Sequence, residues 1–305
     1  MAMRSSRAVL RVDDVAIGST STTPIFARPD LLPLDDLPQW LVQLHGPSIR
    51  LGYRPAQRPL YYYFGSLFEW HNEFINAWSH LFGAMIFVLQ ICIQPLDAYM
   101  LCYRLGAVGC FFTSVSYHIF YPLNAGVYAR LQRADYAGIF VLIGVSAIPY
   151  YSVEFYCQPR LEAAAVATTA VAMLVLAALV ATQEWFGKST PRGKLMRVVA
   201  FSSFAMTCVV FGALALFGGF SPLPYFRADP MLAVALWTAT ALYVLGPVVY
   251  ASAFPERFRP GRFDFIGTSH QTMHVAVLAA ALLNDWCMER MRALRVEVRL
   301  CNSDV

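Results

Sequence analysis

The sequence predicts an all-α membrane protein, built as a seven-transmembrane helix bundle. Two observations lead to this fold class. Hydrophobic residues make up 58% of the 305 residues and charged residues only 14%, whereas about a quarter of the residues in an average soluble chain are charged. The apolar residues also gather into seven runs, each near the length of about 20 residues that a membrane-spanning helix needs.

Short polar links separate the runs, so we expect one transmembrane domain, residues 60–287, without internal repeats. Residues 1–59 form a cytosolic N-terminal tail and residues 288–305 a short C-terminal tail. Within the first tail, residues 35–44 begin with two acids and an early proline and carry apolar residues on one side, which predicts an interfacial helix. The predicted spans are about 74–95, 98–121, 134–152, 161–183, 197–220, 231–253 and 266–287.

Composition and charge limit the classes of partner that the sequence predicts. The net charge is only +4 and the arginines are scattered, so no nucleic-acid partner is expected. The seven cysteines include no CxxC pair and lie mostly inside apolar runs. We therefore expect core residues rather than a disulfide framework. Membrane lipids are the natural surroundings of such an integral, multi-pass protein, in the plasma membrane or an internal membrane.

The distribution of lysine and arginine predicts the orientation. With the N-terminus in the cytosol, the inner segments carry 16 of these residues and the outer segments 7. The short loops alone favour the same orientation, by 9 to 3. The positive-inside rule therefore places the N-terminus in the cytosol and the C-terminus on the extracellular or lumenal side.

Two histidines open the last run. In the stretch SHQTMH, residues 269–274, His270 and His274 stand four residues apart. On a helix this spacing puts both on one face, where two imidazoles can bind one metal ion. The second span ends on the same side of the membrane with His118. Three histidines thus come to one membrane depth.

Three neutral imidazoles with an open position for water are the donor set of a catalytic zinc site. Zinc lowers the pKa of its water to about 7, so a nearby carboxylate can take the proton and the hydroxide can attack a carbonyl. Asp135, in the first turn of the third span, is placed for that role. Ser114 lies one turn before His118 and could bond the substrate oxygen or the water. We predict Zn²⁺ as the cofactor, and Asp135 and Ser114 as catalytic residues.

Each assignment has a structural alternative. The paired histidines could be interfacial polar residues at a helix start, and Asp135 could simply cap its helix, since acids favour helix N-termini. Glu73, Asn76 and His80 share one face at the start of the first span. For these three we favour a polar cluster that ties this helix into the bundle.

Five motifs, in this order and with this spacing, carry a family resemblance. They are FEWHNEFINAWSHL (68–81), SVSYH (114–118), ADYAGI (134–139), PERFRPGRFD (255–264) and SHQTMH (269–274). Together they resemble the progestin and adipoQ receptor family, which includes adiponectin receptors, membrane progestin receptors and bacterial haemolysin III-like proteins. The resemblance covers about residues 50–287.

The resemblance implies seven helices with a cytosolic N-terminus, and zinc held by His118, His270 and His274. It also implies that Asp135 contacts the metal-bound water, with Ser114 nearby. Several members of the family are credited with ceramidase-like hydrolysis of a lipid amide. Residues 51–55 and 71–73 look closest to the membrane progestin receptor branch, whereas residues 134–139 and 154–160 look more like the adiponectin receptor branch. The ligand therefore stays open.

Two functions compete. In the first, the protein is a zinc-dependent lipid amidohydrolase that acts on a sphingolipid and releases a fatty acid. In the second, it is a receptor for an extracellular or steroid ligand that signals to a cytosolic partner, and zinc only joins helices. Both hold together if the ligand stimulates hydrolysis. A transporter is disfavoured, because the spans contain no paired broken helices or series of carboxylates.

Overall fold

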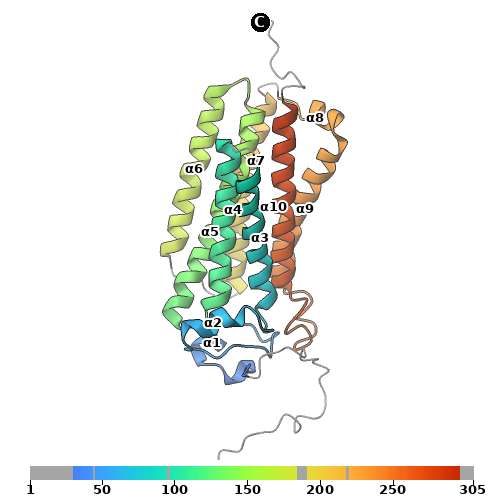
Figure 1. The fold of residues 1–305 in the computed structure, drawn as a ribbon. Coiled ribbons are helices and arrows are strands. Elements are labelled where there is room, and N and C mark those ends of the chain that lie inside the picture. Colours follow the sequence, from blue (N-terminus) through green and yellow to red (C-terminus); the bar gives the residue numbers. More distant parts are fainter. Residues whose placement is uncertain (1–29, 44, 95–96, 184–190, 218–219, 296–305) are drawn as a thin grey trace, which may run out of the picture.

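The computed structural model describes residues 30–43, 45–94, 97–183, 191–217 and 220–295. Residues 1–29 of the predicted N-terminal tail and residues 296–305 of the predicted C-terminal tail lie outside the described residues. Its long helices run up and down beside one another in an upright bundle (Figure 1). No β-strand occurs among the described residues; one isolated bridge pairs Leu32 with Tyr53. The all-α prediction is confirmed.

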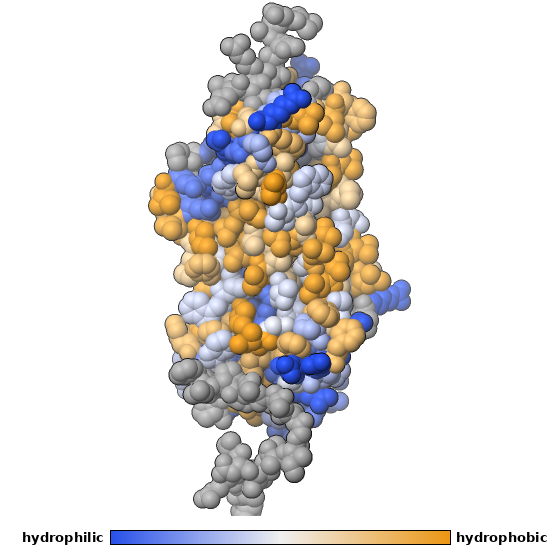
Figure 2. Space-filling model, turned by 90° about the vertical axis from the view of Figure 1, so that its right-hand side faces the viewer, coloured by the Kyte–Doolittle hydropathy of each residue, from blue (hydrophilic) through white to orange (hydrophobic). Residues whose placement is uncertain are grey.

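Six helices are long and apolar enough to cross a membrane. They correspond to the first six predicted runs, and large apolar side chains are exposed on all of them except the helix of residues 125–154. Orange, apolar residues dominate the middle of the face in Figure 2. These helices are α3 (Phe74–Ile93), α4 (Ala98–Phe120), α5 (Ala125–Glu154), α6 (Pro159–Thr182), α7 (Pro191–Phe217) and α9 (Pro230–Ser252).

Helix α10 (Ser269–Leu294) occupies the place of the seventh predicted run and packs mainly along α9 and α3. It is not among the six apolar spans, because it is polar at both ends: its first turns contain His270, Gln271 and His274, and its second half carries further polar and charged residues. It also extends beyond the predicted end at residue 287. The polar residues in that half are Asn284, Asp285, Glu289, Arg290 and Arg292.

Short helices cover the two ends of the bundle. α1 (Gln39–Val42) and α2 (Leu60–Ser66) lie at the lower end and α8 (Leu223–Ala228) at the upper end (Figure 1). The helix predicted at 35–44 is divided into a 3-10 turn, η2 (Leu34–Asp36), and α1. Leu37 between them is extended, with φ −77° and ψ 153°, because the following Pro38 disfavours a helical conformation in the residue before it.

Side-chain caps set several helix starts. Asp97 accepts hydrogen bonds from the N–H groups of Tyr99 and Met100 at the start of α4. Asn124 accepts one from Val127, so α5 begins at Ala125, before the predicted 134. Such caps satisfy backbone donors that have no partner within the helix.

The cysteines depart from the prediction at one position. Cys157, just after the end of α5, is disulfide-bonded, so the expectation of seven core thiols was wrong there. Hydropathy did not separate it from the others, because it too lies near an apolar run. The free cysteines of the described chain are Cys92, Cys102, Cys110, Cys208 and Cys287.

A buried ion pair joins α10 to α4. The guanidinium of Arg104, which is fully buried, donates from Nε to Asp285 Oδ1 at 2.9 Å and from Nη2 to Oδ2 at 3.1 Å. The Nη2 atom also contacts Glu289 Oε1 at 2.5 Å and the side-chain oxygen of Gln94 on the α3 side. Gln90 of α3 donates to Asp285 Oδ2 at 3.2 Å. Three helices therefore meet at this one cluster.

We expect Arg104→Leu to destabilise the protein strongly, by about 3–5 kcal/mol, because it leaves the carboxylate of Asp285 buried and unpaired. The double substitution Arg104→Leu, Asp285→Leu should recover much of this loss. Thermal unfolding of the detergent-purified protein measures both. As a control, Arg290→Leu removes a pair with Asp229 in which the arginine is 42% exposed, and should cost at most about 1 kcal/mol. Equal losses in the single and the double variant would contradict the role of the pair.

Candidate metal centre

The structure brings together the three histidines that the sequence singles out. His118 lies in the last turn of α4, and His270 and His274 lie in the first two turns of α10. One ring nitrogen from each lies within 4.8 Å of the other two. His118 and His274 are buried and His270 is half-buried. Three imidazoles without cysteine form a donor set that suits zinc and leaves a coordination position open.

The start of α10 is fixed by hydrogen bonds, which decides where its two histidines point. Thr268 and Gln271 form a capping box, in which Thr268 Oγ1 accepts from Gln271 N–H at 3.1 Å. The carboxylate of Glu256 accepts from the backbone N–H of Ser269 at 2.8 Å. Because the first turn is held in this way, the face that carries both histidines is turned toward α4 and α3.

Glu73 orients the ring of His118. Its Oε2 atom lies 2.7 Å from His118 Nδ1, and the same oxygen accepts from Asn76 Nδ2 at 2.6 Å. This contact leaves His118 Nε2, which is buried and has no hydrogen-bond partner within the described chain. A carboxylate on one nitrogen of a metal-binding histidine fixes the ring and makes the other nitrogen a better ligand. The pKa of Glu73 is lowered well below its usual range: burial would raise it, but His118, His270 and Asn76 together outweigh that effect.

The backbone of α3 orients the second ring. His274 Nδ1 lies 3.2 Å from the carbonyl oxygen of Asn76 and 3.5 Å from the hydroxyl of Ser79. One face of this imidazole stacks on the ring of His80, with centroids 3.7 Å apart and planes 9° from parallel. With Nδ1 held by α3, Nε2 of His274 is the atom available to a metal.

Arg54 supports the end of α4 from the N-terminal segment. Its guanidinium is buried and donates to the carbonyl oxygens of His118 at 2.5 Å and Ile119 at 3.0 Å. It also donates to Ser66 Oγ at 2.8 Å. A cation at the last carbonyls of a helix is favourable because those groups have no partner within the helix. Arg54 therefore fixes the turn that carries His118.

Asp135 and Ser114 lie beside this centre. Ser114, one turn before His118, is buried, and Asp135 on α5 is half-buried with Ser114 and His118 as polar neighbours. The two helices approach closely at Gly138, where an added Cβ would lie 2.7 Å from Thr113 Oγ1. The lack of a side chain at this position brings Asp135 up to α4. The catalytic roles of Asp135 and Ser114 stay predictions.

Sequence reasoning placed Glu73 and Asn76 at the right depth but gave them another role. They do connect α3 to its neighbours, as expected, but they do so by hydrogen bonding to the histidines of the cluster: Glu73 contacts His118, and the carbonyl of Asn76 contacts His274. The signal was their spacing of three residues on one face of a helix that starts at the same membrane depth. Arg54 lies within residues 51–55, which contribute to the family resemblance, but the sequence did not indicate its role, because the backbone oxygens that it binds are more than 60 positions away.

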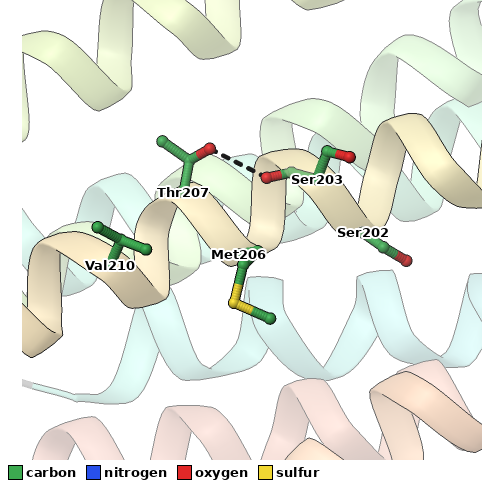
Figure 3. Close-up of a pocket in the computed structure, with 5 residues that line it drawn as sticks. All are labelled: Ser202, Ser203, Met206, Thr207 and Val210. Carbon is green, nitrogen blue, oxygen red and sulfur yellow. Dashed lines mark hydrogen bonds between the residues drawn. The ribbon is translucent and has the colours of Figure 1, made fainter.

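A shallow hollow on the outside of α7 is separate from this centre (Figure 3). One of its polar groups is occupied within the helix, since the hydroxyl of Thr207 donates to the carbonyl of Ser203 at 3.0 Å. We assign it no function. The lining residues are Ser202, Ser203, Met206, Thr207 and Val210.

Fold and site together define an integral, multi-pass helical membrane protein with a buried histidine cluster near one end of the bundle. Residues 68–284 match the haemolysin-III related family. This match covers more than half of the chain, so the chain belongs to that family, the progestin and adipoQ receptor family.

Several relatives carry receptor names. The adiponectin receptor protein of Drosophila melanogaster is 28% identical over 280 residues, covering 87% of this chain and 60% of the relative. Progestin and adipoQ receptor-like protein 1 of Caenorhabditis elegans is 28% identical, covering 88% of this chain and 63% of the relative. The ADIPOR-like receptor IZH2 of Saccharomyces cerevisiae is 26% identical, and 92% of each chain is covered. The chain thus spans less than two thirds of the first two relatives.

We expect Glu73→Gln to weaken divalent-metal binding by about 10–100-fold, because the amide orients the ring of His118 less firmly and makes its free nitrogen less basic. Competition with a chelator measures this affinity. Glu154→Gln is the matched control, since Glu154 ends α5 at the far end of the bundle. Unchanged affinity in Glu73→Gln would show that the carboxylate does not act on the centre.

Proposed function

We propose that the chain is a seven-transmembrane receptor of the progestin and adipoQ type that holds zinc near the cytosolic side of the membrane and hydrolyses a ceramide-like lipid amide. One observation carries the proposal: three buried or half-buried imidazoles converge, and Glu73 and Asn76 hold the outer nitrogens of two of them. A purely structural polar cluster has no need to keep a buried nitrogen such as His118 Nε2 without a partner.

In this proposal α10 is the seventh span. Its buried charge supports rather than opposes the assignment, because Arg104 pairs with Asp285 inside the bundle. An odd number of spans places the two termini on opposite sides. The excess of Lys and Arg in the inner segments, 16 against 7, favours a cytosolic N-terminus. The disulfide at Cys157 fits an oxidising compartment at the other end.

The residues around the histidines have distinct roles in hydrolysis. His118, His270 and His274 hold zinc, which when bound lowers the pKa of a coordinated water to about 7. Asp135 would hold the proton that hydrolysis releases and pass it to the amine as the amide C–N bond breaks. Ser114 donates a hydrogen bond to the carbonyl oxygen of the substrate. The neighbouring membrane lipids supply a sphingolipid substrate and take up the fatty acid product.

Elemental analysis tests the metal. We expect about one zinc per purified chain, and its loss in His270→Ala, His274→Ala, because one imidazole cannot hold the ion. His45→Phe is the control, since this ring packs on Tyr53 and Tyr121 and keeps its aromatic contacts in the variant. A wild-type protein that is purified without chelator and contains no zinc would overturn the metal centre.

Release of fatty acid from ceramide tests the catalysis. Asp135→Asn should keep its zinc and lose at least about 100-fold in turnover, because an amide cannot take up the proton. Zinc content measured on the same sample separates loss of chemistry from loss of metal. If zinc-loaded wild type releases no fatty acid from any sphingolipid tested, the hydrolase assignment fails.

The second candidate is a receptor in which zinc is structural. The receptor names of the relatives favour it, and so does the way in which the histidines join α4 to α10. An extracellular or steroid ligand would then shift these helices, and a cytosolic partner would respond. Ligand binding that survives Asp135→Asn, in a protein without amidase activity, would favour this candidate.

A further inference from the structure

The loop between α9 and α10, residues 253–268, is folded by its own acidic side chains. Glu256 accepts hydrogen bonds from the backbone N–H of Ser269, at 2.8 Å, and from its hydroxyl. Asp264 accepts one from the backbone N–H of Arg50 at 2.8 Å. Both carboxylates are buried. The negative charges of the loop are thus directed inward, and they hold it against α10 and the N-terminal segment.

The cationic side chains of the loop are on its outside. Arg257, Arg259 and Arg262 are exposed, and within the described chain none of them forms an ion pair. By sequence the loop carries three arginines and two acids, but burial of both acids leaves three positive charges on the outer face. Folding therefore produces a basic surface that the net charge of the loop does not reveal.

Large apolar side chains stand among these arginines. Phe254, Phe258 and Ile266 are 55%, 64% and 57% exposed, and the guanidinium of Arg257 lies 4.7 Å from the centroid of the Phe258 ring. The loop begins directly after α9, at the lower right of the bundle in Figure 1, and blue groups lie at the lower end of the face in Figure 2. At the end of a spanning helix, this combination suits the headgroup layer, with apolar side chains in the lipid and cations at the depth of the phosphates.

We propose that this loop is a binding site for the anionic headgroups of phospholipids in the leaflet that it faces. Guanidinium groups bind phosphate oxygens in a planar, often bidentate arrangement. The folded loop presents three of them in a fixed setting beside apolar anchors. Because the loop also carries Glu256, which holds the first turn of α10, lipid binding stabilises the end of the bundle that contains the histidines.

Native mass spectrometry of the detergent-purified full chain tests this site, with phosphatidylserine and phosphatidylcholine as probes. We expect tighter binding of phosphatidylserine, weakened by salt. Each arginine near an anionic surface contributes about fivefold, so Arg257→Gln, Arg259→Gln, Arg262→Gln should reduce the preference at least about tenfold. The corresponding triple lysine variant should keep most of it.

Arg130→Gln is the matched control, because Arg130 is exposed near the start of α5, at the same end of the bundle. It should leave the preference unchanged. An equal loss in this control would mean that the end of the bundle attracts anions without a site, and would overturn the proposal. Full preference in the triple glutamine variant would also overturn it, because the anionic lipid would then bind elsewhere on the protein. Melting temperatures check folding; should the triple variant not fold, Arg259→Gln alone should lose about fivefold.

Discussion

The ion pair between Arg104 and Asp285 is the contact on which the position of α10 depends. Apolar surroundings require a charged side chain to find its partner inside the protein, and α10 is the most polar of the long helices in its second half. Because Asp285 is neutralised by α4 and bonded by α3, α10 can pack along α3 and approach α4 without leaving this charge unpaired. The same arrangement brings its first turns to the end of α4.

The histidine cluster is built at the other end of these three helices. α4 supplies His118, α10 supplies His270 and His274, and α3 supplies the groups that hold the rings, Glu73 and Asn76. The two ends of the group formed by α3, α4 and α10 thus have different roles. One end satisfies buried charge, and the other keeps ring nitrogens available in a buried, polar setting.

The segments outside the bundle finish the centre. Arg54 binds the carbonyl oxygen of His118 from the N-terminal side, and Glu256 binds the first turn of α10 from the loop before it. Neither residue belongs to a long helix. Changes at this end of the molecule can therefore reach the histidines through short hydrogen bonds, which links the proposed lipid-binding loop to the centre without a shared ligand.

The sequence by itself determined what depends on local order along the chain. Apolar runs of the right length predicted seven spanning helices, of which six are confirmed, and the spacing of four residues predicted that His270 and His274 share a face. Only the tertiary structure decided which side chains meet across helices: Glu73 with His118, Arg54 with the end of α4, and Asp285 with Arg104. The physical reason is that hydropathy and helical period act between near neighbours in the sequence. A hydrogen bond between distant residues depends instead on the rotation and depth of each helix, which packing sets.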